Sequence, residues 1–557
     1  MAGDFNKGRL KRLDRRKTQW EETTLKQALD KRPERKENFL SSSWVPIKRV
    51  YTPLDIPDFD YEKDMGFPGE YPFTRGVFSS MYRGKLWTFR TQVGFGGAED
   101  TKDRLEALMR AGGAISLDFD NPTLIGLDPD DPQSEGDVGT GGLSVSCLKD
   151  FEPLFEGIPL DQVTTSMTVN FTAPIIYAMY LAVAEKQGIP WDKISGTIQF
   201  DLLKEYLTMK CYVFPPRPSL RWWTDLVSFS IKNTPRWNNT SIWLVGPTAA
   251  HSIGWGLASA MTYVDAALDA GMDVDEFAPR LSFLNASSID FFESIAKLRA
   301  LRRLWARLMK EKYGAKNPNS CKLRIYYPAS PGDLKSREPL NNIVRSTISV
   351  LASVLAGANA IDMGAYDEPF AIPSEEAKRL CVRTQQIIAH ESHVADVVDP
   401  LGGSYYVEAY TNWLEEEAKR LIKEIEDLGG YIRCIESGFF QRVFADYGYR
   451  LYQEERRGER PIVGVNIFTS EEAERPIELH ETDPEVELRQ IERVKQVRSL
   501  RDSRRVSALL QQIREAASDK TNVMPFILDA VKADATLGEI MQALKDVWGE
   551  YEETPVF

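Results

Sequence analysis

The sequence predicts an α/β fold: a (β/α)8 TIM barrel, with an N-terminal arm before it and a C-terminal helical extension after it. Short runs rich in β-branched and aromatic residues recur about eight times between residues 86 and 364. Helix-like segments separate most of these runs, which is the alternation typical of a parallel barrel. Beyond about residue 400 the strand-like runs stop. The predicted strands are 86–93, 114–119, 163–170, 195–200, 240–246, 280–285, 322–327 and 358–364.

The helices predicted between these strands are Glu99 to Ala111, Ala173 to Gly188, Ala249 to Ala270, Ile289 to Tyr313 and Ile343 to Leu355. The segment that begins at Ile289 has the apolar spacing of an amphipathic helix. It ends in a Lys/Arg cluster followed by Gly314, which is a typical helix stop. These patterns divide the chain into an arm and linker (1–70), a barrel (71–405) and a helical extension (406–557).

The two ends of the chain are highly charged and helix-prone. Residues 1 to about 40 mix Lys and Arg with Asp and Glu, and proline-punctuated chain follows. This pattern fits either a partner-binding helical arm or a charged helix that only contacts water. In the extension, Asn412 to Glu426 and Pro484 to Ala517 are predicted helices, with irregular chain around Arg457–Arg460 between them.

Composition bounds the class of function. The formal net charge is −13 and the pI about 5.2, which argues against nucleic acid as the main partner. The 5 cysteines form no CxxC pair, no signal sequence is visible and no apolar run is long enough to cross a membrane, so we expect a cytoplasmic protein. The 4 histidines lack metal-ligand spacing, and no protein-held metal is expected.

Several predicted strands carry small polar residues where a barrel core normally has Val, Ile or Leu. Side chains two positions apart in a strand share one face. An unpaired polar group buried in a core costs roughly 1–3 kcal/mol, so these pairs suggest a long polar ligand along the barrel axis. Alternatively, they face the outer helices or bond to one another. The pairs are Ser166 with Thr168, Thr197 with Gln199, and Arg280 with Ser282.

From about Tyr71 to Asn466 the chain resembles the methylmalonyl-CoA mutase family of adenosylcobalamin-dependent acyl-CoA mutases. The motifs that carry this resemblance are numerous and occur in the family's order. They are Tyr71-Pro72-Phe73-Thr74-Arg75-Gly76, Met81-Tyr82, Trp87-Thr88-Phe89-Arg90, Gly136-Asp137-Val138-Gly139, Ser166-Met167-Thr168-Val169-Asn170, Gly196-Thr197-Ile198-Gln199, Phe277-Ala278-Pro279-Arg280-Leu281-Ser282 and Asp399-Pro400-Leu401-Gly402-Gly403-Ser404-Tyr405.

The resemblance implies a barrel threaded by the pantetheine arm of coenzyme A, with Lys85 and Arg90 serving phosphates. The substrate and CoA contacts that it implies are Phe78, Met81, Lys85, Thr88, Arg90, Ser116, Ser166, Thr168, Thr197, Gln199, Asn238, Arg280 and Ser282. The catalytic positions that it implies are Gln92, Gln199, Met209 and Glu368. Contacts to adenosylcobalamin are implied for Gly136, Val138, Gly139, Pro328, Asn359 and Glu368.

The chemistry of this family is radical, so no acid–base pair is required, and the protein's task is to position groups and exclude water. The family's cobalamin domain has a DxHxxG motif, whose His binds cobalt. No histidine here has Asp two residues before it. We therefore expect a separate small subunit to supply the cobalt ligand, in a heteromer such as a heterotetramer.

The chain also departs from the family around the acyl group. Where methylmalonyl-CoA mutases place Tyr and Arg against the substrate carboxylate, this chain has Gln92 and Met209, which disfavours a methylmalonyl substrate. Lys210 is adjacent, but on a helix it would point about 100° away. The family's thioester-binding His is missing from a shortened loop, and His251 is a weak substitute. Pro328 and Asn359 replace two glutamines and indicate a reshaped upper pocket.

The sequence thus predicts a catalytic mutase subunit for an acyl-CoA that is bulkier or less polar than methylmalonyl-CoA. Met209 favours a branched acyl group of the isobutyryl, 2-hydroxyisobutyryl or pivalyl type, whereas the shortened loop favours an aryl- or alkyl-substituted succinyl group. Two alternatives stay open: a non-catalytic scaffold subunit of a heteromeric mutase, and a cobalamin-independent reaction on CoA thioesters.

Overall fold

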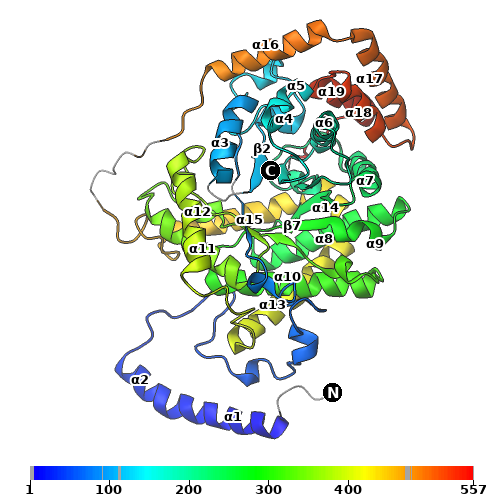
Figure 1. Ribbon diagram of the computed structural model, residues 1–557. Helices are drawn as coiled ribbons and strands as arrows, with labels where there is room; N and C mark the ends of the chain where they lie inside the picture. Colours follow the sequence, from blue (N-terminus) through cyan, green and yellow to red (C-terminus); the bar gives the residue numbers. More distant parts are fainter. Residues whose placement is uncertain (1–5, 91, 111–113, 471–476, 478, 556–557) are drawn as a thin grey trace.

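The computed structural model describes residues 6–90, 92–110, 114–470, 477 and 479–555. Its strands are all parallel to their neighbours and form two sheets, of order β1-β9-β8-β7-β6 and β2-β3-β4-β5 (Figure 1). The strands are β1 (Thr88–Phe89), β2 (Ile115–Asp118), β3 (Thr164–Thr168), β4 (Ser195–Ile198), β5 (Trp237–Asn238), β6 (Thr240–Trp243), β7 (Leu281–Leu284), β8 (Ile325–Tyr326) and β9 (Ala360–Ile361).

The two sheets are joined at both edges without forming one continuous sheet. At one seam, isolated parallel bridges connect Arg90 with Ala114 and Val93 with Leu117, beside β1 and β2. At the other, the backbone N–H of Ser241 in β6 donates to the carbonyl of Gln199, just after β4, at 2.7 Å. Neighbouring strands therefore follow one another in chain order around a ring, which is the strand order of a (β/α)8 barrel.

Helices follow the strands around the ring. They are α3 (Ala98–Arg110), α4 (Asn121–Ile125), α5 (Leu148–Phe151), α6 (Ala173–Lys186), α7 (Pro216–Asn233), α8 (Ala249–Asp269), α9 (Val274–Phe277), α10 (Phe291–Arg307), α11 (Asn341–Leu355) and α12 (Glu375–His390). Each predicted strand contains an observed one, and each predicted helix has its counterpart. Ala111, the predicted end of the first helix, lies outside the described residues.

Five helices of the ring, α4, α5, α7, α9 and α12, are not among the helices predicted from the sequence, and α7 is the longest of them. Helix α7 begins at Pro216 among prolines and carries Trp222, Trp223 and Val227, residues whose propensities also suit strands and loops. Its apolar face is fully buried. Tertiary packing therefore outweighs local propensity here, as is common for amphipathic helices.

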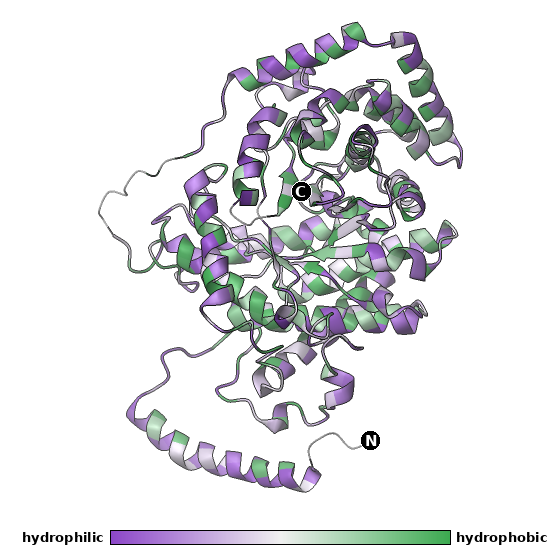
Figure 2. Ribbon diagram, viewed as in Figure 1, coloured by the Kyte–Doolittle hydropathy of each residue, from purple (hydrophilic) through white to green (hydrophobic). Residues whose placement is uncertain are grey.

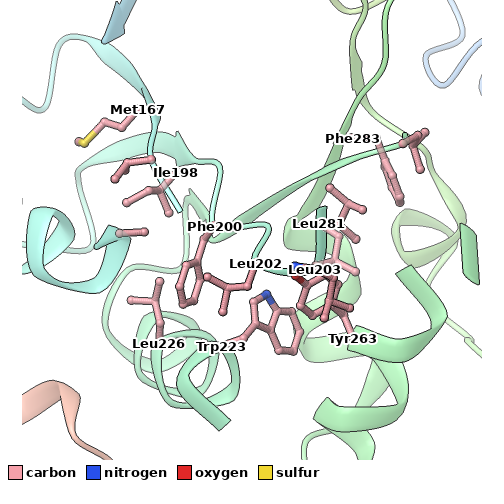
Figure 3. Close-up of a cluster of buried hydrophobic side chains, with 14 of the residues drawn as sticks. Met167, Ile198, Phe200, Leu202, Leu203, Trp223, Leu226, Tyr263, Leu281 and Phe283 are labelled. Carbon is pink, nitrogen blue, oxygen red and sulfur yellow. Dashed lines mark hydrogen bonds between the residues drawn. The ribbon is translucent and has the colours of Figure 1, made fainter. Parts of the chain in front are cut away.

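One face of the strands packs against the helices. Figure 3 shows Met167, Ile198, Leu281 and Phe283 in a buried apolar cluster with Trp223, Leu226 and Tyr263 from α7 and α8. Because side chains alternate across a strand, the residues between these apolar ones face the barrel interior. The register thus orients Ser166, Thr197 and Ser282 inward and contradicts the alternative in which they face the outer helices.

The helices of the arm and the last four helices of the extension, which follow residue 484, lie at opposite ends of the molecule (Figure 1). Helix α1 (Lys7–Trp20) continues through a π-helical turn into α2 (Lys26–Lys31), buries none of its residues and is largely hydrophilic (Figure 2). The extension comprises α13 (Tyr405–Asp427), α14 (Tyr431–Glu436), α15 (Phe439–Arg456), α16 (Glu485–Leu500), α17 (Ser503–Ser518), α18 (Met524–Lys532) and α19 (Leu537–Trp548). No helix in the described ranges combines the length and apolarity needed to span a bilayer.

The predicted helix Pro484 to Ala517 is two helices. Arg501 is extended, and the side chain of Asp502 caps α17 by accepting hydrogen bonds from the backbone N–H groups of Arg504 and Arg505. An aspartate with this capping geometry ends one helix and begins the next.

Candidate active site

Small polar residues from four neighbouring strands share one level of the barrel interior. The backbone register aligns Ser116 with Ser166, Ser166 with Thr197, and Thr197 with Asn238. The amide of Asn238 donates to Thr197 Oγ1 at 3.1 Å. On the facing side of the ring, Ser282 donates to the carbonyl of Thr240 at 3.0 Å. The interior at this level is therefore lined by hydroxyl and amide groups.

Two residues further along the strands, the interior carries a carboxylate and two amides. Gln92 donates to Asp118 Oδ1 at 3.2 Å and to Thr168 Oγ1 at 3.4 Å. Burial raises the pKa of Asp118 to about 6. Gln199 accepts a hydrogen bond from Asn170 at 3.1 Å. This level forms a polar chamber toward the C-terminal ends of the strands.

Among the described residues, three polar atoms of the interior are buried without a hydrogen-bond partner: Arg90 Nε, Gln199 Nε2 and Asn238 Oδ1. Gln199 follows β4, Asn238 lies in the neighbouring strand β5, and Arg90 follows β1. Buried polar groups are nearly always paired, and an unpaired one costs roughly 1–3 kcal/mol. Two donors and one acceptor arranged around the axis fit a ligand that offers both acceptor and donor groups, as an amide-containing chain does.

A cluster of cations marks the N-terminal mouth of the barrel. Arg236, Arg280 and Arg324 immediately precede β5, β7 and β8. Burial and the charge of Arg236 lower the pKa of Arg280, and burial and the charge of Arg280 lower the pKa of Arg324. Three mutually repelling guanidinium groups at one mouth form a site for a polyanion such as a polyphosphate.

The predicted contacts around β1 divide between the mouth and the interior. Phe78 and Lys85 are exposed and precede β1, while Thr88 is half-buried in it. Met81 instead is buried, with its thioether beside Gly76 and Gly357. Its position is that of a packing residue.

Arg90 does not lie at the mouth. Its guanidinium lies 5.5 Å from the ring centre of Tyr326, and burial lowers its pKa although Tyr326, Asp362 and Asp118 oppose this. That Arg90 serves a phosphate stays a prediction; its guanidinium lies inside the barrel and not beside the three arginines of the mouth. The sequence showed its place in the strand but not that the strand turns this residue inward, toward carboxylates of β2 and β9.

Glu368 lies among buried charges beyond the end of β9. Its carboxylate accepts from the backbone N–H of Ala365 at 2.9 Å, and burial raises its pKa. Nearby, Lys378 pairs with Asp362 at 3.6 Å. Burial alone would lower the pKa of Lys378, but the carboxylates of Asp362 and Glu368 outweigh it and raise that pKa. The sequence singled out Glu368 but missed Asp118, Asp362 and Lys378, because their proximity depends on long-range packing.

A cavity of about 1580 Å³ opens at the C-terminal face, lined by loops that follow β4, β6, β7 and β8. Met209, whose side chain is largely exposed, lines it together with Trp243. The linker before the barrel crosses this face, where Trp44 donates to Glu454 at 2.7 Å and stacks on Arg450. Active sites of such barrels form at this face.

The residues predicted to contact the cofactor are scattered. Pro328 follows β8, toward the C-terminal face, but Asn359 precedes β9 and accepts from the N–H of Ile325 at 2.9 Å, deeper in the barrel. The prediction that both flank one upper pocket is therefore wrong for Asn359. The three residues of the 136–139 motif lie in a loop beyond β2: Gly136, Val138 and Gly139.

That loop is packed under α16. Gly136 donates to Glu487 at 3.0 Å, Val138 is buried, and the N–H of Gly139 donates to Asp120 at 2.7 Å. Gly139 has a positive φ, and a Cβ there would meet Val486 at 2.5 Å. Backbone geometry and close packing account for this motif.

His251 does not replace the missing family histidine. Its Nδ1 lies 2.7 Å from Thr248 Oγ1 at the start of α8, and its ring packs on Trp255. Burial lowers its pKa to about 4. In the described ranges, no group of three or more His, Cys, Asp or Glu side chains is arranged to hold a metal ion.

Comparison with known proteins identifies this architecture. The family model "Methylmalonyl-CoA mutase" matches residues 40–550. The chain is 44% identical to the 2-hydroxyisobutanoyl-CoA mutase large subunit of Aquincola tertiaricarbonis, over 98% of both proteins. It is 37% identical to the methylmalonyl-CoA mutase of Rhizobium meliloti and 36% to the human mitochondrial enzyme, covering 92% and 91% of this chain but 72% and 68% of theirs. The chain belongs to the methylmalonyl-CoA mutase family.

Proposed function

We propose that this chain is the large, catalytic subunit of an adenosylcobalamin-dependent mutase that rearranges the carbon skeleton of a branched, uncharged acyl-CoA. The observation that carries the proposal is the polar axis of the barrel. It runs from the basic mouth of Arg236, Arg280 and Arg324, past the unpaired atoms of Asn238 and Gln199, to the chamber. Phosphates, pantetheine amides and acyl group of a CoA thioester fit these three regions in that order.

Two side chains toward the C-terminal face favour the branched class of substrate. Met209 on the wall of the cavity offers no charge to a carboxylate, and Asp118 in the chamber would repel one when it is ionised. The name of the Aquincola relative gives a branched, hydroxylated acyl group as its substrate. The amide of Gln92 and the carboxylate of Asp118 provide hydrogen-bonding groups for such a hydroxyl. We therefore do not propose aryl- or alkyl-substituted succinyl thioesters as substrates.

Members of this family depend on adenosylcobalamin, and the C-terminal face fits that cofactor. The cavity there is large enough for a corrinoid, and Glu368, whose raised pKa reflects its burial, lies beyond the end of β9. When bound, the cofactor supplies the radical that starts the rearrangement. The chain's own residues bind the thioester, orient its acyl group and exclude water from it.

A small cobalamin-binding subunit completes the proposed enzyme. None of the 4 histidines has an Asp two positions before it, so a cobalt-ligating DxHxxG motif is absent from this sequence. The small subunit then supplies the cobalt ligand in a cytoplasmic heteromer, such as a heterotetramer. The 5 cysteines are all free, which agrees with a reducing compartment.

Electron paramagnetic resonance tests the proposed reaction. The full chain, its candidate small subunit and adenosylcobalamin are mixed with isobutyryl-, 2-hydroxyisobutyryl-, pivalyl-, methylmalonyl- and benzylsuccinyl-CoA in turn. We expect a cobalt(II)–organic radical signal only with the uncharged branched thioesters, which are isobutyryl-, 2-hydroxyisobutyryl- and pivalyl-CoA. A signal with benzylsuccinyl-CoA alone would contradict the substrate class. No signal, with subunit association demonstrated, would favour the scaffold alternative.

The basic mouth gives a second prediction. Arg280→Ala and Arg324→Ala are each expected to weaken binding of acyl-CoA about tenfold or more, because each removes a charge-assisted phosphate contact. Arg217→Ala, which removes an exposed cation beyond the opposite ends of the strands, is the matched control. Calorimetric titration at two salt concentrations measures the effect. Unchanged affinity for acyl-CoA in both variants would mean that the phosphates of CoA do not bind at this mouth.

A further inference from the structure

The loop that carries Met209 on the wall of the large cavity is held by a distant part of the chain. Met209 and Lys210 both adopt left-handed backbone conformations, with φ of 49° and 64°. Residues with a side chain rarely adopt this conformation unless the surrounding structure enforces it. The enforcing contacts come from the segment that follows α19.

Aromatic packing and one backbone bond fix that segment against the loop that follows β4. The N–H of Tyr551 donates to the carbonyl of Val213 at 2.8 Å. The ring of Tyr551 packs edge-on against Tyr206 and Tyr212, with ring centres 4.9 and 5.0 Å apart. Trp548 packs on Phe214 in the same way. The loop is thus clamped on both sides of Met209 and Lys210.

Glu553 completes the clamp and binds the one cation next to Met209 in the sequence. Its carboxylate pairs with Lys210 Nζ and accepts hydrogen bonds from Gln441 at 2.9 Å and Tyr212 at 3.5 Å. Met209 lines the large cavity, whereas Lys210 does not. The pairing with Glu553 therefore keeps the ammonium group out of the cavity wall.

The clamped loop also connects to the polar chamber. The N–H of Cys211 donates to Glu205 at 3.2 Å, and the other oxygen of Glu205 accepts from Asn170 at 2.6 Å. The same Asn170 amide donates to Gln199. Through these contacts the segment after α19 stabilises the loop that carries Met209. It also stabilises the hydrogen bonds around Gln199.

We propose that Glu553 is a specificity-determining positioning residue: by holding Lys210 away from the cavity, it leaves Met209 as the side chain that this loop turns toward the cavity, and so disfavours carboxylated acyl groups there. This inference rests on the proposed binding of acyl-CoA in the barrel. Without Glu553, Lys210 is free to turn toward a carboxylate in the cavity. The barrel would then bind a charged thioester more tightly than the wild-type chain does.

Calorimetric titration of the full-length chain with butyryl-CoA and succinyl-CoA tests this role. The two thioesters differ mainly in a terminal methyl or carboxylate. In Glu553→Gln we expect the ratio of dissociation constants, succinyl over butyryl, to fall about threefold to fivefold, the size of a partly exposed ion pair. Glu552→Gln, at the exposed neighbouring residue, should leave the ratio unchanged.

The double variant Glu553→Gln/Lys210→Ala should restore the wild-type ratio, while Lys210→Ala alone should not change it. An unchanged ratio in Glu553→Gln would overturn the inference, as would a lowered ratio that persists in the double variant. If the wild-type chain binds neither thioester, the proposed function fails first, and this outcome is distinct from both of the others.

Discussion

Replacing Arg299 by methionine is expected to lower the free energy of unfolding by about 3–5 kcal/mol. The Arg299 side chain in α10 is fully buried and pairs with both Asp399 and Glu408. Burial alone would lower its pKa, but these two carboxylates outweigh burial and raise it. In the variant, the partner that Glu408 keeps within the described part of the chain is the N–H of Gly403, so its charge remains buried and almost uncompensated.

The ion pair between Arg299 and Asp399 also explains why two sequence motifs that are far apart in the chain lie close together in the fold. Asp399 begins the 399–405 motif, and it also pairs with Arg75 of the 71–76 motif at 3.1 Å. Through these ion pairs, Arg299 of α10 connects the start of the barrel with α13. The urea midpoint of unfolding, compared with that of Arg420→Met, measures the effect.

Arg420 is a suitable control because it lies on the exposed side of α13. Its side chain is 57% exposed and pairs with Glu417 one helical turn away. Such exposed pairs contribute less than about 0.5 kcal/mol. A loss in Arg299→Met no larger than that in Arg420→Met would contradict the role of the buried pair.

The order of the elements could be predicted from the sequence because it depends on local periodicity. The strand that contains Ser166 and Thr168 shows polar residues at every second position, and the structure orients both inward. Helix α7 was not predicted because its tryptophans and prolines suit several structures, and burial of its apolar face in the core selects the helix.

The site could be predicted only as far as single positions allow. Small residues such as Ser166 and Thr197 follow from their spacing, but the pairing of Asp118 with Gln92 or of Lys378 with Asp362 joins distant segments. Asn359 was misplaced because a motif gives order along a strand and not depth in the barrel. The clamp by Glu553 has no local signal, since its partner Lys210 lies more than 300 residues earlier.

Replacing Asp118 by asparagine is expected to stabilise the protein at neutral pH, by up to about 3 kcal/mol. Burial raises the pKa of Asp118 from 3.8 to about 6, so ionisation at pH 7 costs folding free energy. The raised pKa belongs to the folded state. The cost is therefore fully present above about pH 6 and disappears as the pH falls toward 4. The gain in the variant should follow the same course.

Replacing Asp120, two residues further along the chain, by asparagine should instead destabilise the protein. Burial raises its pKa to about 6 as well, but its two oxygens accept from the N–H groups of Thr123 at 3.0 Å and Gly139 at 2.7 Å. In Asp120→Asn an amide NH2 would face one of these donors, which costs about 1–3 kcal/mol. Thermal unfolding of both variants between pH 4 and pH 8 measures the pair. If both substitutions changed the free energy of unfolding in the same direction, burial alone would determine how these two carboxylates affect stability. Opposite signs would mean that Asp120 is retained for its hydrogen bonds and Asp118 at a cost in stability, as expected for a residue kept for what the chamber binds.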